Sequence, residues 1–279
     1  MKTLLSLCFA LHFISPVHAQ YKMADEMADP IVLGSTHKIW SKELNEKRML
    51  NIYLPPGYKA EDTKHYPVIY LLDGGLDEDF IHIVGLVQFN TFEWIGRVPE
   101  CIVVGIVNTD RKRDMTFPTT IKGDKEKWPT TGGSAKFMSY IEKEVKPYVN
   151  KQFRTTASAT LIGESLGGLF ATQVLFTKPQ LFDRYIIISP SLWWNNGSLL
   201  KQQPVAIKGK KTIYIGVGKE GLAPTEEPHV MEVDANVLKD KIEQLHINDI
   251  TIYFDYLPEE THATIGHQAV LNAFKRVYK

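Results

Sequence analysis

Residues 161–170 read LIGESLGGLF, and the centre of this segment is a G-x-S-x-G motif around Ser165. An apolar run precedes the motif (157–162), and a run compatible with a helix follows it (166–176). A strand, a sharp turn and a helix form the context in which such a motif pushes a serine hydroxyl out to where a substrate can reach it. The turn is strained, so the two glycines of the motif let the helix pass close to the strand. The segment therefore predicts that Ser165 is a nucleophile.

Further apolar runs without alternation predict strands that are buried on both faces, as in a parallel sheet. These runs comprise residues 68–72, 102–107, 185–188 and 212–217, and a last strand is expected at 250–256. Nearer the N-terminus, residues 31–40 and 48–54 read as two strands of another kind. The second of these alternates in the manner of an antiparallel strand near a sheet edge.

Helical segments separate the predicted parallel strands. They are expected at residues 80–95, 137–148, 230–245 and 269–278. In the third of these segments, Val233, Val237 and Ile242 are expected to face inward. Two antiparallel strands followed by alternating strands and helices predict an α/β fold, with a mostly parallel central sheet and helices on both faces. Substrates bind such sheets beyond the carboxyl ends of the strands, so the loops there are the place to search for a site.

The first 19 residues have the features of a secretory signal peptide. Lys2 is followed by an apolar run (4–14), and the small residue Ala19 precedes a plausible cleavage point. The run is too short to serve as a stable membrane anchor. We therefore expect an exported protein, periplasmic or extracellular. Residues 20–279 contain no repeat or linker-like stretch, which favours a single domain.

The composition excludes several classes of partner and cofactor. Lys and Arg number 32, as do Asp and Glu, so nothing indicates a nucleic acid or an anionic membrane surface as partner. Cys101 is the only cysteine beyond the predicted leader, so an internal disulfide is not expected, and a buried, inert thiol is the favoured interpretation. Motifs for metal or nucleotide binding are missing from the sequence, so no cofactor is expected.

A serine nucleophile needs a base, and the base needs an acid that orients it. In folds of this kind these residues follow the serine in the order acid, then histidine. His262 lies just past the end of the last predicted strand, which is where that order places the base. His267 is expected on the closing helix instead, and His229 follows a different strand.

The acid is expected in the loop after the strand at 212–217. This loop offers three glutamates, namely Glu220, Glu226 and Glu227. Glu220 is closest to the strand end and is flanked by glycines, so we favour it, with the other two as alternatives.

Acyl transfer also needs backbone N–H groups that stabilise an oxyanion. The N–H of Leu166, the residue after the nucleophile, is expected to be one donor, and a Gly-rich loop after the strand at 68–72 is expected to supply the other. In this loop Gly75 is preferred, because a residue without a side chain lets the backbone approach a substrate. Leu76 is the alternative.

Two further segments could contact a substrate. Residues 108–133 form a long connection, and connections of this length are usually functional or mobile. Within it, Arg111 and Arg113 could bind an anionic or phenolic group, although a solvated basic loop is the simpler interpretation. Trp193 and Trp194 could form a platform for a sugar or aryl ring, or at least one of them could pack into the core.

Taken together, these segments resemble the putative-esterase family of α/β hydrolases, which includes enterochelin esterase-like proteins, esterase D and bacterial feruloyl esterases. The resemblance covers nearly all of residues 20–279 and rests on RMLNIYLPP (48–56), PVIYLLDGG (67–75), GIVNTDRKRD (105–114), LIGESLGGLF (161–170), ISPSLWW (188–194) and Thr261-His262. It implies an α/β-hydrolase fold, ester hydrolysis with Ser165 as nucleophile and His262 as base, and oxyanion donors at Gly75 and Leu166. Family members often carry His or Gln before the nucleophile, whereas this chain has Glu164.

We therefore expect an exported serine carboxylic-ester hydrolase that acts through a Ser-acid-His triad and an acyl-enzyme. A siderophore ester and a polysaccharide acyl ester are both compatible substrates, so the expected partner is a small-molecule or carbohydrate ester. An acyltransferase is a variant of this hypothesis. The alternative from another class is a non-catalytic binding module built on a hydrolase fold.

Overall fold

The structure is a computed structural model that describes residues 29–225 and 228–279. Residues 34–279 belong to one compact unit. The predicted signal peptide lies outside the described residues, as do Glu226 and Glu227.

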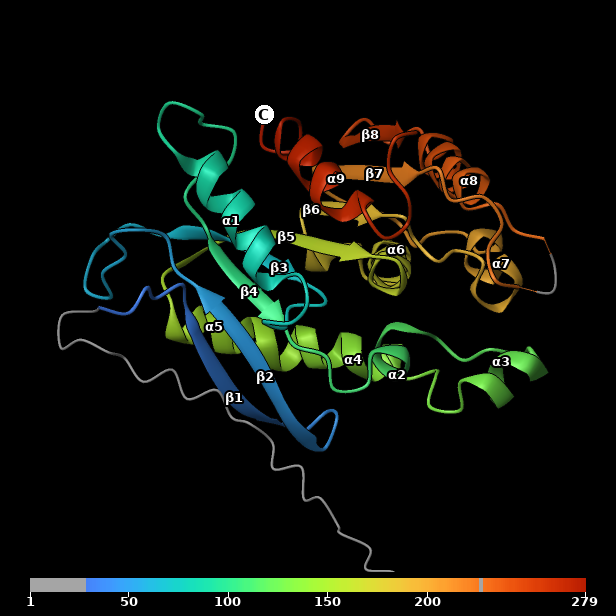
Figure 1. Ribbon diagram of the computed structural model, residues 1–279, viewed down its shortest axis with the longest axis horizontal. Helices are drawn as coiled ribbons and strands as arrows, with labels where there is room; N and C mark the ends of the chain where they lie inside the picture. Colours follow the sequence, from blue (N-terminus) through green and yellow to red (C-terminus); the bar gives the residue numbers. More distant parts are fainter. Residues whose placement is uncertain (1–28, 226–227) are drawn as a thin grey trace, which may run out of the picture. The chain divides into compact units, whose positions relative to one another are not determined.

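The described residues form an eight-stranded sheet with the order β1-β2-β4-β3-β5-β6-β7-β8. The strands are β1 (Ser35–Ser41), β2 (Glu46–Tyr53), β3 (Tyr66–Leu71), β4 (Ile102–Ile106), β5 (Thr155–Glu164), β6 (Arg184–Ile188), β7 (Lys211–Gly218) and β8 (Ile250–Leu257). The β1–β2 and β2–β4 pairs are antiparallel, and the other neighbours are parallel. This arrangement confirms the predicted mostly parallel sheet with antiparallel N-terminal strands (Figure 1).

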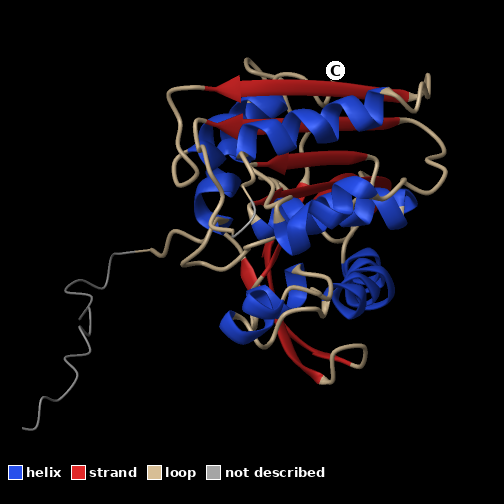
Figure 2. Ribbon diagram, turned by 90° about the vertical axis from the view of Figure 1, so that its right-hand side faces the viewer, coloured by secondary structure: helices blue, strands red, loops and turns tan. Residues whose placement is uncertain are grey.

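Helices lie on both sides of the sheet (Figure 2). They are α1 (Phe80–Thr91), α2 (Arg111–Met115), α3 (Lys122–Lys127), α4 (Ser134–Tyr140), α5 (Lys146–Gln152), α6 (Leu166–Thr177), α7 (Trp194–Lys201), α8 (Met231–Glu243) and α9 (Ile265–Phe274). A π-helical turn, Ile141–Val145, joins α4 to α5, so the helix predicted at 137–148 belongs to a longer helical stretch. The long connection at 108–133 contains α2 and α3 and is therefore not a plain loop.

Side chains that alternate along the parallel strands build two separate cores. On one face, Tyr70 and Leu161 belong to the same buried cluster as Phe170 of α6 and Leu238 of α8. On the other face, α9 packs against β6, β7 and β8 and contacts α1. Because both faces are covered, the parallel strands read as continuous apolar runs, which is why their positions could be predicted.

The inward face of α8 differs from the prediction. Val233 and Val237 are 56% and 42% exposed, and only Ile242 of the predicted three is buried. The buried face instead includes Met231, Ala235 and Leu238, with Asp234 among them. The prediction was wrong because Met231, Ala235, Leu238 and Ile242, at the spacing of one helix face, form the apolar face that packs into the core, and the two valines lie outside it.

Candidate active site

Ser165 sits in a sharp turn between β5 and α6. Its backbone has φ +58° and ψ −116°, a conformation in which a non-glycine residue is strained. A Cβ atom at Gly163 would lie 2.5 Å from the carbonyl oxygen of Gly167, so no side chain fits there without a shift. The backbone N–H of Ser165 donates to the carbonyl of Ile188 on the neighbouring strand at 3.0 Å. These constraints fix the serine at the carboxyl end of the sheet.

Three predicted residues come together at this point, although they are far apart in the sequence. The Oγ of Ser165 lies 3.0 Å from Nε2 of His262, and Nδ1 of His262 lies 2.5 Å from Oε2 of Glu220. Glu220 follows β7 and His262 follows β8, so parallel neighbours deliver both side chains to the same edge. The geometry is that of a nucleophile, a base and an orienting acid.

The carboxylate of Glu220 is almost completely buried, with 2% of its side chain exposed. Besides His262, the hydroxyl of Ser189 and the backbone N–H of Gly218 donate to its Oε1. Burial alone would raise the pKa of Glu220, but the hydrogen bonds from His262 and Ser189 lower it overall. The hydrogen bond to Glu220 in turn raises the pKa of His262. The pair thus favours an ionised acid beside a basic imidazole.

The two predicted oxyanion donors, the N–H groups of Leu166 and Gly75, have different surroundings in the structure. Leu166 opens helix α6, where backbone N–H groups have no helical partner, and it lines the same cavity as Ser165. The N–H of Gly75, by contrast, donates to Oε2 of Glu78 at 2.7 Å. The carboxylate of Glu78, three residues further on, thus accepts from this N–H in the structure, and the role of Gly75 as an oxyanion donor stays a prediction.

Arg111 lies in the cavity at Ser165, and Arg113 does not. The guanidinium of Arg111 forms two hydrogen bonds to Asp73, at 2.6 and 2.9 Å, and donates to the carbonyl oxygen of Glu164 at 3.2 Å. Arg113 instead bonds to Glu46 and Asp114. The hypothesis that Arg113 reaches a substrate is therefore corrected, because its donors serve ion pairs that join α2 to β2.

Trp193 and Trp194 are both buried, and both line the cavity at Ser165. Trp194 is 1% exposed, and its indole N–H donates to the carbonyl of Phe117 at 2.8 Å. Trp193 faces the cavity at Ser165 together with Trp128, a residue that was not singled out from the sequence. Trp128 could have been singled out from the sequence, because it is an aromatic residue inside the long connection at 108–133. Ser189, which supports Glu220, was also missed, although a polar residue directly after a buried strand marks the same sheet edge.

Glu164, the residue before Ser165, lies beside other carboxyl groups. Burial, together with the nearby Asp79, raises the pKa of Glu164 to about 7. Burial and the charge of Asp73 likewise raise the pKa of Asp79 to about 6. Both residues line one small cavity beneath the turn. The region therefore carries protons near neutral pH that ordinary carboxyl groups would have lost.

Among residues 29–225 and 228–279, His, Cys, Asp and Glu side chains form no cluster suited to a metal ion. Within the same ranges, every helix is too short or too polar to span a bilayer. Cys101 is buried, and burial raises the pKa of its thiol.

The chain is similar to several known proteins. The chain is 34% identical over 171 residues to the ferri-bacillibactin esterase BesA of Bacillus subtilis, a match that covers 57% of this chain and 59% of BesA. The match thus spans less than two thirds of that relative's length. A BES protein from Bacillus cereus has a similar structure, with 28% identity and a TM-score of 0.77 over 91% of this chain and 97% of that one.

An IroE-like serine hydrolase from Shewanella oneidensis is similar as well. It has 31% identity and a TM-score of 0.76 over 87% of this chain and 79% of that one. The sequence pattern of the family described as "Putative esterase" matches residues 41–260. This range makes up most of the chain and includes Ser165 and Glu220. The chain therefore belongs to the putative-esterase family.

Proposed function

We propose that this chain hydrolyses carboxylic esters through a covalent acyl-enzyme, with Ser165 as nucleophile, His262 as base and Glu220 as orienting acid. The observation that carries the proposal is the continuous set of hydrogen bonds from the Ser165 hydroxyl through His262 to Glu220. Membership of the family supports the same class of reaction. A base and a nucleophile in hydrogen-bond contact are what acyl transfer requires.

In the first step, Nε2 of His262 takes the proton from the Ser165 hydroxyl while Oγ attacks the ester carbonyl carbon. The N–H of Leu166 donates to the resulting oxyanion, and the guanidinium of Arg111, in the same cavity, is the second donor that we propose. The C–O bond to the alcohol then breaks, and His262 gives its proton to the departing oxygen. The acyl group stays on Ser165.

In the second step, His262 takes a proton from a water molecule, which attacks the acyl carbonyl carbon. The bond between that carbon and Oγ of Ser165 breaks, Ser165 regains a proton from His262, and the free acid leaves. Glu220 stabilises the imidazolium that forms in each step, because its carboxylate accepts the hydrogen bond from Nδ1.

The substrate that we favour is a siderophore ester. Relatives carry the names ferri-bacillibactin esterase, siderophore triacetylfusarinine C esterase and siderophore enterobactin esterase. The N-terminal sequence, with its charged start and apolar run, supports export to the periplasm or the medium. The exported protein would then bind this small-molecule substrate outside the cytoplasm.

Hydrolysis by purified residues 20–279 tests the proposal. The substrates are p-nitrophenyl butyrate, methyl ferulate and enterobactin, each with wild type, Ser165→Ala and Ser191→Ala. Ser191 is a matched control, since its Oγ lies 3.2 Å from that of Ser165. We expect Ser165→Ala to lower turnover by a factor of about 10⁶, and Ser191→Ala to lower it far less. Equal activity of Ser165→Ala and wild type would exclude the mechanism, and a preference for methyl ferulate would replace the siderophore by a plant-wall ester.

A further inference from the structure

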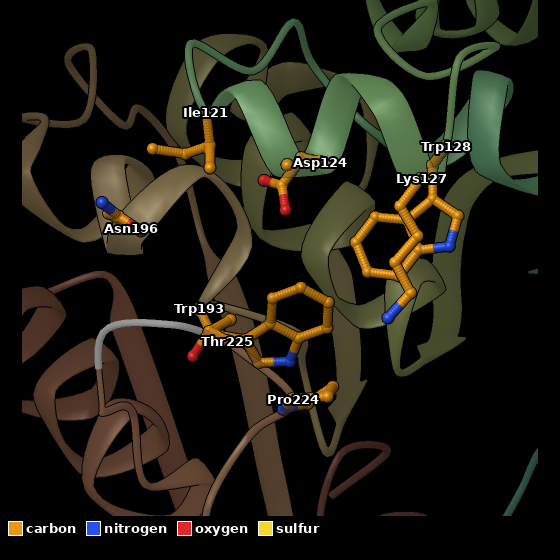
Figure 3. A pocket seen from close by; sticks show the side chains of 9 residues that line it. Ile121, Asp124, Lys127, Trp128, Trp193, Asn196, Pro224 and Thr225 are labelled. Atoms are coloured by element: carbon orange, nitrogen blue, oxygen red, sulfur yellow. The ribbon is translucent and has the colours of Figure 1, made fainter.

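The turn that carries Ser165 has two sides. Its outer side faces the cavity at Ser165, whose wall includes Trp128 and Trp193, and Figure 3 shows these two side chains in the adjoining pocket. Its inner side faces a smaller cavity, which Glu164 and Asp79 line. The start of α1 and the start of α9 border this inner cavity, and the two helices pack side by side on this face of the sheet (Figure 1). The side chain of Glu164 therefore belongs to the inner side of the turn.

The carboxyl group of Glu164 rests against the first turn of α9. Gly266 is the second residue of this helix, and a Cβ atom there would overlap Oε2 of Glu164. A residue without a side chain is thus what lets the carboxyl group approach the helix. The helix begins close to the base, because the N–H of Ile265 donates to the carbonyl of Thr261, the residue before His262, at 3.1 Å. Glu164 therefore contacts the short segment that positions His262.

This carboxyl group has no bonded partner of its own. Within residues 29–225 and 228–279 it forms no hydrogen bond and no ion pair. Arg111 donates to the backbone carbonyl of Glu164, but its two bonds to a carboxylate both go to Asp73. Buried carboxyl groups are normally paired, because an unpaired one costs free energy. Glu164 thus serves neither as half of a structural ion pair nor as a helix cap.

The groups that face Glu164 come from several elements. Burial opposes its ionisation most, and so do three carboxyl groups, namely Asp79 at the start of α1, Asp73 after β3 and Glu220 after β7. The cationic form of His262 favours the ionisation, and Arg111 of α2 faces the group as well. His82 of α1 lines the inner cavity and stacks on His267 of α9. The resulting pKa of about 7 leaves Glu164 neutral in acid and negatively charged above neutral pH.

His262 is the group that gains from this charge. Two anions raise the pKa of His262: Glu220 acts through a hydrogen bond and its charge, and Glu164 acts through its charge alone. In the proposed reaction the imidazole takes a proton in each step, so positive charge develops on His262 in the transition state. A fixed negative charge nearby, partly shielded from solvent, lowers the free energy of that state.

We propose that Glu164 is a positioning residue for the base: its carboxylate, held between the Ser165 turn and the first turn of α9, stabilises the imidazolium of His262 and makes no contact with the reacting atoms. The inference rests on the proposed esterase function and adds a residue to its reaction. It also gives a reason for an unpaired buried carboxylate, since the charge that costs stability serves the reaction.

Hydrolysis of p-nitrophenyl butyrate between pH 5 and 9 tests this role. Glu164→Gln keeps the shape of the side chain and removes its charge, and Glu259→Gln removes an exposed charge from the His262 loop as the matched control. We expect Glu164→Gln to lower the plateau of kcat/KM above pH 8 by about three- to tenfold. Its acid limb should move to lower pH to the same extent, so that its kcat/KM equals that of wild type near pH 5. The control should follow wild type throughout.

Titration of the His262 imidazole by NMR measures the same interaction without turnover, and its signal is the one lost in His262→Ala. The midpoint should fall in Glu164→Gln and stay in place in Glu259→Gln. An unchanged midpoint in Glu164→Gln, or a rate lowered by one factor at every pH as a structural defect would give, overturns the proposal. If even wild type fails to hydrolyse the ester, the proposed function is contradicted, and the titration still decides whether Glu164 acts on His262.

Discussion

Glu220 shows how hydrogen bonds can keep the pKa of a buried carboxyl group low. An unpaired carboxylate would be costly at 2% exposure, but three donors surround this one. The sequence narrowed the acid to three glutamates, and proximity to the strand end favoured Glu220, which is the one that the structure places against His262. The position of Ser189 directly after a buried strand marks the sheet edge, but its contact with Glu220, 31 positions away, could not be read from the sequence.

The raised pKa of His262 predicts the pH dependence of catalysis. The base must be neutral to act, so kcat/KM should fall as pH drops through a value above 6.5, the ordinary pKa of histidine. Glu220→Gln removes the carboxylate whose hydrogen bond and charge raise this pKa, so it should move the acid limb to lower pH. It should also lower kcat at the optimum by about 10⁴-fold, as the wrong tautomer is favoured. Rate profiles between pH 5 and 9 measure both effects, and an unshifted limb in Glu220→Gln would contradict the assignment.

Glu164 predicts a pH-dependent effect on stability. Its pKa is raised from 4.5 to about 7, so its charged form is disfavoured in the folded state and lowers the unfolding free energy above pH 7. Glu164→Gln should therefore stabilise the protein at pH 8, by on the order of 1 kcal/mol. The gain should shrink as pH falls through 7 and vanish below about 4.5. Urea unfolding at pH 8 and pH 5 measures it, and an equal effect at both values would refute this account.

At the scale of elements, the turn between β5 and α6 depends on close approach of backbone. The Cβ of an alanine at Gly163 would meet the carbonyl of Gly167, as the motif alone indicated. The wall formed by Trp128 and Trp193 was beyond prediction, because 65 positions separate the two residues and α3 lies in a connection that was read as a loop. Local patterns identify turns, whereas contacts across loops depend on how the whole sheet brings them together.

Gly163→Ala tests that close approach. We expect it to lower the unfolding free energy by about 1–3 kcal/mol, as overpacking does, and to displace Ser165 so that ester hydrolysis falls. Gly85→Ala is the matched control: a Cβ there meets nothing within 4 Å, and α1 should gain up to about 1 kcal/mol from a better helix former. Thermal unfolding of the two variants measures the contrast. If Gly163→Ala were as stable and active as wild type, the turn would not depend on close packing.

At the scale of the whole molecule, the parallel sheet is what assembles the site. Strands β5, β7 and β8 end at one edge, and each contributes one member of the Ser165–Glu220–His262 set through the loop that follows it. This much was predictable, because apolar runs located the strands and the order of residues assigned the loops. The inward face of α8 was predicted wrongly, since it depends on which side of the helix packs against the sheet.

The central claim is that Ser165 is a nucleophile activated by His262. Labelling with a fluorophosphonate, followed by mass spectrometry of the digested protein, tests it most directly. We predict one adduct on the peptide that contains Ser165, no adduct there in Ser165→Ala, and labelling of His262→Ala slowed by several orders of magnitude. A folded wild-type protein that remains unlabelled, or carries the adduct on another residue, would contradict the account.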